Sequence, residues 1–290
     1  MKKILFLTLI PLVLFSCNSK KQTDKSVSEV TINELWSTEQ VFKIPESVLY
    51  DKNNKIIFVA NINGEPAEKN ALGFISLLET DGNIRELEWV TGLNAPKGMG
   101  IHQGKLYVSD ITDIKVIDIK KKEVIEVIEI SGSAFLNDIT VGDDGDVYIT
   151  DSDTNKIYLL SNGEITTWLE GDMLMGPNGL FIEKERLLLA SFGQEKFKSI
   201  ELKSKKVSIL SDSIGQGDGI AKDKRNNYVV SGWNGELRYV FKDGRKVHLL
   251  DTREQNISAA DIDMIVEEDI VLVPTFFDNR VVAYRLNFSE

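Results

Sequence analysis

A short pattern recurs along this chain at intervals of about 40 residues, and it limits the possible folds more than any other feature. Each copy has a small or turn-forming residue, a polar residue, a small residue and then an apolar run. Six copies align, the last more loosely, at 45–48, 96–99, 136–139, 177–180, 217–220 and 259–262. The first interval is longer because a polar loop occupies 61–73. A fixed period of this length indicates one supersecondary unit repeated through the chain.

Each copy of the pattern leads into strands rather than helices. A second run rich in β-branched and aromatic residues follows, such as "IIFVAN", "VYITD" and "YVVSG", and then two further alternating runs. Period-two alternation broken by frequent turn residues is typical of β-sheets. Four strands in a unit of about 40 residues is the spacing of a propeller blade. The sequence therefore predicts an all-β protein, a six-bladed β-propeller of four-stranded blades.

The two ends of the repeat array indicate how the ring closes. The sixth unit has only three strands before the chain ends, and 34–44 ("ELWSTEQVFKI") is a spare strand before the first unit. We expect this N-terminal strand to become the outer strand of the sixth blade, since an open sheet edge would otherwise remain. The polar second position of each copy begins an innermost strand, so these positions should form a ring at one mouth of the channel. They are Glu46, Lys97, Asn137, Asn178, Asp218 and Ala260.

The first residues resemble an export signal rather than part of the fold. Two lysines precede the apolar stretch 4–15, which is too short to span a bilayer comfortably, and Ser16 and Cys17 follow it. We interpret 1–16 as a lipoprotein signal peptide, 17–32 as a flexible tether and 33–290 as the propeller. Cys17, the only cysteine, is then the lipid acceptor. The alternative is a plain secretory signal with an incidental cysteine.

The charge and histidine content narrow the partners of the domain. The net charge is −11, and no basic patch interleaved with aromatics is present, which disfavours nucleic acid. Only His102 and His248 occur, which disfavours a histidine-rich transition-metal site. We expect a monomer with a small-molecule substrate. It would lie outside the cytoplasm, lipid-anchored to a bacterial membrane and facing the periplasm or the cell surface.

Four of the six ring residues carry side-chain oxygens: Glu46, Asn137, Asn178 and Asp218. Ca²⁺ and Mg²⁺ prefer carboxylate, amide and water oxygens, and two converging carboxylates repel each other unless a cation or a proton intervenes. The ring therefore predicts one divalent cation in the channel, with Ca²⁺ expected and Mg²⁺, Mn²⁺ or Zn²⁺ as alternatives. Each residue taken alone is equally typical of a turn, so backbone geometry is the competing explanation.

On these motifs the sequence resembles the senescence marker protein (regucalcin), gluconolactonase and luciferin-regenerating enzyme family, across about 35–286. "GPNGL", "GDGI" and "PESVLYD" place Asn178, Asp218 and Glu46 at the family's metal ligands, and "LNDITVGDDGDVYITD" places Asn137 where substrate is contacted near the metal. The resemblance implies a six-bladed propeller and a metal-dependent hydrolase of a lactone or similar ester. In it the cation would polarise the carbonyl, and Asp218 would orient or deprotonate the attacking water.

Three residues depart from that family's pattern. Phe135 stands where many of its lactonases have arginine, Ser47 replaces glycine, and Lys97 adds a cation to the ring. Lys97 either binds an anionic substrate or is a solvated surface lysine. Four aromatic residues either wall the pocket or pack between blades: Phe192, Trp233, Phe276 and Phe277. The alternative function is a non-catalytic, lipid-anchored propeller that binds a ligand or a protein, and a related propeller lyase or synthase is a third candidate.

Overall fold

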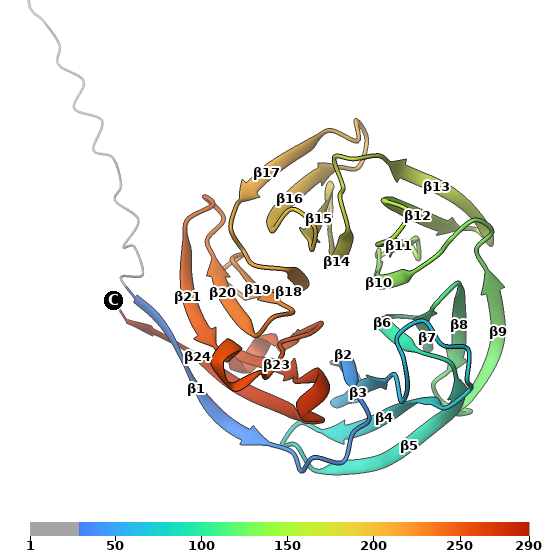
Figure 1. Ribbon diagram of the computed structural model, residues 1–290, viewed down its shortest axis with the longest axis horizontal. Coiled ribbons are helices and arrows are strands. Elements are labelled where there is room, and N and C mark those ends of the chain that lie inside the picture. Colours follow the sequence, from blue (N-terminus) through green and yellow to red (C-terminus); the bar gives the residue numbers. More distant parts are fainter. Residues whose placement is uncertain (1–28, 290) are drawn as a thin grey trace, which may run out of the picture.

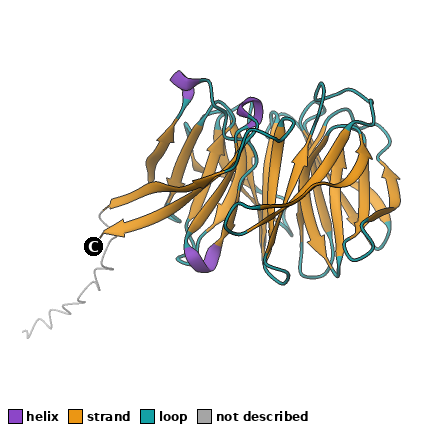
Figure 2. Cartoon of the chain, turned by 90° about the horizontal axis from the view of Figure 1, so that it is seen from below, coloured by secondary structure: helices purple, strands orange, loops and turns teal. Residues whose placement is uncertain are grey.

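The computed structural model describes residues 29–289, which form six four-stranded antiparallel sheets around a central channel (Figure 1). The predicted all-β, six-bladed propeller is confirmed. Figure 2 shows the strands running between the two faces of the disc, with loops at both ends. The described residues contain three short 3-10 helices, η1 (Arg253–Gln255), η2 (Val266–Glu268) and η3 (Phe276–Asp278). None of the helices in this part of the chain is long and apolar enough to cross a membrane.

Blades 1 to 5 each use four consecutive strands, ordered from the channel outward (Figure 1). Their bounds are β2 (Pro45–Asp51), β3 (Ile56–Asn61), β4 (Gly73–Glu79) and β5 (Ile84–Leu93) in blade 1; β6 (Pro96–His102), β7 (Lys105–Asp110), β8 (Asp113–Asp118) and β9 (Glu123–Glu129) in blade 2; β10 (Leu136–Val141), β11 (Val147–Asp151), β12 (Lys156–Ser161) and β13 (Glu164–Glu170) in blade 3; β14 (Pro177–Glu183), β15 (Arg186–Ser191), β16 (Lys196–Glu201) and β17 (Val207–Ser211) in blade 4; and β18 (Gly217–Lys222), β19 (Tyr228–Gly232), β20 (Glu236–Val240) and β21 (Lys246–Asp251) in blade 5. Each innermost strand begins at the first residue of its sequence motif.

The sixth blade joins the two ends of the chain, as expected. It contains β22 (Asp263–Ile265), β23 (Ile270–Pro274), β24 (Val281–Ser289) and, outermost, β1 (Glu29–Ser37). The predicted bounds of the closing strand, 34–44, were wrong. The strand begins earlier because Val30 is 2% exposed and packs into the core, inside the segment that we assigned to the tether. The signal peptide, Cys17 and most of the tether lie outside the described residues.

The core is divided among the blade junctions. One cluster of buried apolar side chains fills each of the six junctions between neighbouring blades. A smaller cluster around Ile62, Ala95 and Phe276 lies beside the channel mouth. Because every blade packs against two neighbours, the innermost strands are fixed relative to one another, and so are the side chains at their ends.

Candidate functional site

The ring residues lie at irregularities in the sheets. In blades 1 to 5 the pairing between the innermost strand and the second strand shifts at the start of the motif, for example between Leu136 and Ile139 and between Pro177 and Leu180. A bulge of this kind turns a side chain away from the regular ladder. The recurring motif therefore encodes a recurring bulge, and the bulge presents the polar residue to the channel.

Hydroxyl groups on the second strand of three blades form hydrogen bonds to the backbone of the next blade. Each donates a hydrogen bond to the carbonyl oxygen of a ring residue in the next blade. The bonds run from Ser109 to Asn137, from Thr150 to Asn178 (2.9 Å) and from Ser231 to Ala260 (2.7 Å). These bonds satisfy carbonyl groups that the bulge would leave unpaired, and they keep neighbouring ring residues in register.

The third motif position in blade 4 must be glycine. A Cβ atom on Gly179 would lie 1.6 Å from the carbonyl oxygen of Asp218. We expect Gly179→Ala to push β14 and β18 apart and to lower the free energy of unfolding by about 2 kcal/mol. Gly142→Ala is the matched control, since its new methyl group would meet only the tip of the Asp144 side chain at 2.6 Å and an Ile182 methyl at 3.4 Å. Urea unfolding measures both, and equal losses would contradict the proposed close approach.

The five polar ring residues open onto one cavity of about 330 Å³. Glu46, Lys97, Asn137, Asn178 and Asp218 all line it, whereas Ala260 is buried but does not. The cavity lies at the end of the channel where the innermost strands begin. The structure therefore brings together the residues that the sequence placed in a ring.

Three oxygens in this cavity have no hydrogen-bond partner. Glu46 Oε2, Asn178 Oδ1 and Asp218 Oδ1 are buried and accept no hydrogen bond from any described residue. Buried polar atoms without partners are rare, and a ligand bound in this cavity could satisfy these three oxygens, which come from three different blades. Carboxylate and amide oxygens are the ligands that Ca²⁺ prefers, so this donor set fits a hard divalent cation. Asn137 differs from the three, because its Nδ2 donates to Ser152 Oγ at 3.2 Å.

The electrostatics of the cavity also favour a cation. Burial raises the pKa of Glu46 to about 8; the Asp261 carboxylate adds to this rise and the Lys97 ammonium opposes it. Burial raises the pKa of Asp218 well above its usual value, with further contributions from Glu46 and Asp261, while a hydrogen bond from the Asn178 side chain lowers it. Ionising either carboxylate without a counter-charge is therefore unfavourable in free energy, and a bound divalent cation would compensate for it.

Lys97 is not a solvated surface lysine. It is 1% exposed, and its Nζ donates to the carbonyl oxygens of Pro66 (2.9 Å) and Ala95 (3.0 Å). The ammonium also lies 4.4 Å from the centre of the Phe135 ring. Burial lowers its pKa to about 8, and Glu46 opposes this shift. Since an ammonium has three N–H groups and two are bonded to carbonyls, one remains available to a ligand in the cavity that Lys97 lines.

The aromatic residues separate into two groups. Phe192, Trp233 and Phe276 line the cavity, whereas Phe277 is 61% exposed and contacts the edge of Trp233 from outside it. Sequence reasoning missed other wall residues, namely Ile62, Pro66, Ser152 and Asp153. The sequence held a signal for two of these residues. Ile62 and Ser152 directly follow the second strand of a blade, as do Phe192 and Trp233, two of the four aromatic residues predicted from the sequence.

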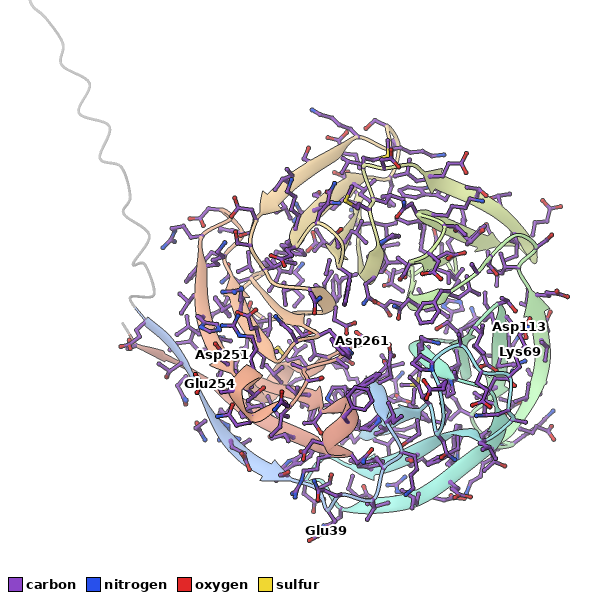
Figure 3. All side chains as sticks on the ribbon, in the orientation of Figure 1. Glu39, Lys69, Asp113, Asp251, Glu254 and Asp261 are labelled. Carbon is purple, nitrogen blue, oxygen red and sulfur yellow. The ribbon has the colours of Figure 1, made fainter. Side chains whose placement is uncertain are left out.

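Two buried carboxylates behind the ring were also missed. Asp138 and Asp261 occupy the third motif position, where the other blades have serine or glycine, and Figure 3 places Asp261 beside the central channel. Asp138 accepts hydrogen bonds from the backbone N–H groups of Ile139 (2.6 Å) and Leu180 (2.5 Å), and Asp261 accepts one from Ser47 Oγ (2.6 Å). Both oxygens of Asp138 and Oδ2 of Asp261 thus have partners, and Leu180 and Ser47 lie on the innermost strands of neighbouring blades, so we assign these carboxylates to holding the strands together.

A second group of metal-ligand types lies in blade 5, where ligand atoms of Glu236, His248 and Asp251 are within 4.8 Å of one another. Its carboxylates already have cationic partners. Arg238 donates to Glu236 at 2.6 Å, and Arg253 donates to Asp251 at 2.5 Å. The guanidinium groups neutralise these carboxylates, so we assign this group to an ion-pair network.

Comparisons with known proteins identify the fold. No protein family matches the sequence, and no curated protein matches it. Two solved structures are similar: a catalytically inactive histidine-to-alanine variant of virginiamycin B lyase from Staphylococcus aureus with quinupristin (14% identity, 89% of this chain and 99% of that chain, TM-score 0.62), and a streptogramin B lyase (14% identity, 89% and 98%, TM-score 0.66). At this identity the likeness shows the propeller fold alone, and the resemblance to the gluconolactonase family gains no support from the family comparison.

Proposed function

We propose that this protein is a metal-dependent hydrolase of a lactone or similar ester. Glu46, Asn178 and Asp218 would hold one divalent cation, with Ca²⁺ expected, and Asn137 would lie beside it. The observation that carries the proposal is the set of three buried oxygens without partners around one cavity. When bound there, a divalent cation supplies Lewis-acid polarisation of the substrate carbonyl.

The protein's own residues account for the remaining steps. Asp218 orients a water molecule against the carbonyl carbon and accepts its proton, and the hydrogen bond from Asn178 fixes the carboxylate. The C–O bond of the ester then breaks, and the leaving oxygen takes the proton from Asp218. Lys97 and Asn137 line the same cavity and would contact the substrate oxygens.

Hydrolysis fits the cavity better than the elimination reaction of a lyase. The virginiamycin B lyase variant that is similar to this chain is inactive after loss of a histidine. Both histidines of this chain lie within the described residues, and neither His102 nor His248 lines the cavity. Asp218 is therefore the residue that we propose for proton transfer.

The proposal places the enzyme outside the cytoplasm, as a monomer anchored to a bacterial membrane through Cys17. Strand β1 begins at Glu29, and its other end, Ser37, lies near Pro274 and Val281, on the side of the cavity. Glu29 is therefore at the end of β1 farther from the cavity.

Turnover of a panel of lactones and esters, with and without Ca²⁺, Mg²⁺ or Mn²⁺, tests the proposal. We expect cation-dependent hydrolysis, and we expect Asp218→Asn to lower kcat/KM by about a hundredfold or more, because it removes both a metal ligand and the proton acceptor. Asp143→Asn, in an exposed turn of blade 3, is the control and should leave turnover unchanged. A protein that binds the cation but hydrolyses nothing in the panel would instead be a binding module.

A further inference from the structure

The cavity has one aromatic side. Phe192, Trp233 and Phe276 project from blades 4, 5 and 6, with ring centres 6.5 Å apart for Phe192 and Trp233 and 5.5 Å apart for Trp233 and Phe276. The exposed ring of Phe277 lies outside the cavity, 6.3 Å from Trp233. Trp233 is thus the centre of a continuous aromatic surface. Such a surface favours a flat apolar group with its face or edge against the indole.

The remaining walls offer few polar partners. Pro66 and Phe135 contribute further apolar surface, and Ile62 packs in one cluster with Phe276 and Trp233. The Ser152 hydroxyl donates to the Pro177 carbonyl oxygen at 2.8 Å and lies 3.2 Å from the Asn137 amide nitrogen, so it is already engaged. Asp153 is the remaining charged side chain of these walls, so a substrate rich in hydroxyl groups would lose more bonds to water here than it regains.

The polar groups are concentrated at the base of the cavity. The unpartnered oxygens of Glu46, Asn178 and Asp218 and the buried ammonium of Lys97 lie there. A bound molecule would therefore present one oxygen-bearing group to the base and an apolar group to the aromatic side. The volume of about 330 Å³ is at the small end of ligand sites, which suits a compound of one or two rings.

We propose that the substrate is a lactone or ester of a flat apolar compound, aromatic in the simplest case, and that Trp233 determines this specificity. The chemical step in this statement rests on the proposed function, whereas the preference in binding rests on the cavity walls alone. A polyhydroxylated sugar lactone is correspondingly a poor ligand.

Two hydrolysis-resistant δ-lactams with the same ring size test the preference: a benzo-fused δ-lactam and glucono-δ-lactam. Calorimetry with the full chain in Ca²⁺ should show the benzo-fused compound binding at least about tenfold more tightly. Trp233→Ala should weaken its binding by about tenfold, and Trp233→Phe, which keeps a flat ring, should retain most of the affinity. Phe277→Ala is the matched control, since this exposed ring touches Trp233 but does not line the cavity, and it should change binding by less than about twofold.

The outcomes separate this inference from the proposed hydrolase. Equal or tighter binding of glucono-δ-lactam, or a Trp233→Ala variant with unchanged affinity, would overturn the inference. Tight binding of the benzo-fused lactam without hydrolysis of the matching lactone under any cation would sustain the inference and reject the hydrolase. Preferred hydrolysis of gluconolactone would sustain the hydrolase and reject the inference.

Discussion

Val30→Asp is expected to lower the free energy of unfolding by about 3–5 kcal/mol, the range for an uncompensated buried charge. Val30 is 2% exposed and packs between blades 5 and 6, in a cluster that includes Tyr239 and Leu286. Its strand, β1, pairs along its length with β24 and forms the outermost strand of the sixth blade. A charge at this position should therefore detach β1 and expose the edge of β24 rather than create a local defect.

Thr31→Asp provides the matched control for ring closure. Thr31 is the next residue of the same strand, its side chain is exposed, and it pairs with Asn287. The same aspartate there should change stability by less than about 0.5 kcal/mol. Urea unfolding at equal protein concentration compares the two variants. Similar losses in both would show that charge on β1, and not loss of the buried contact, is responsible.

The fold was predictable because one local pattern is repeated six times. The motif starts the innermost strand in blades 1 to 5 and directly precedes it in blade 6, so its period gives the number of blades, and the three-stranded last unit requires a partner from the N-terminus. The bounds of that partner were harder to predict. Val30 and Ile32 alternate with polar residues, but two alternating positions are too few to distinguish a strand from a tether, and the burial of Val30 depends on blade 5 and β24.

The ring of site residues was predictable for a related reason, since the same bulge recurs at the same motif position. The surroundings of the ring depend on contacts between distant segments, and these were not predictable. Lys97 is buried beneath a loop of blade 1. In that loop Pro66, 31 residues before Lys97, accepts a hydrogen bond from the Lys97 ammonium. Asp138 is held by Leu180, 42 residues later in the next blade. Only the assembled propeller defines these distances.

Ca²⁺ at about a thousand times its dissociation constant is expected to raise the free energy of unfolding by about 4.1 kcal/mol. The folded chain brings together unpartnered oxygens of Glu46, Asn178 and Asp218 from blades 1, 4 and 5, and the unfolded chain does not. Asp218→Asn should lose most of this stabilisation. Without Ca²⁺ the same variant should be no less stable than the wild type, because burial and the nearby Glu46 disfavour the charged carboxylate that it replaces.

Asp223→Asn, in the same blade, should show the opposite pattern. Asp223 is also buried, but its oxygens accept hydrogen bonds from the backbone of Asn227 (2.8 Å) and from the Tyr239 hydroxyl (2.6 Å). The variant should therefore be destabilised without Ca²⁺ and yet keep the full response to it. Denaturation of metal-depleted protein, verified by elemental analysis, measures both effects. If the metal-free wild type showed no response to Ca²⁺, Mg²⁺ or Mn²⁺, the unpartnered oxygens would not be metal ligands. The free-energy penalty of burying these oxygens would then have to be offset by protonation of the carboxylates or by hydrogen bonds from the substrate.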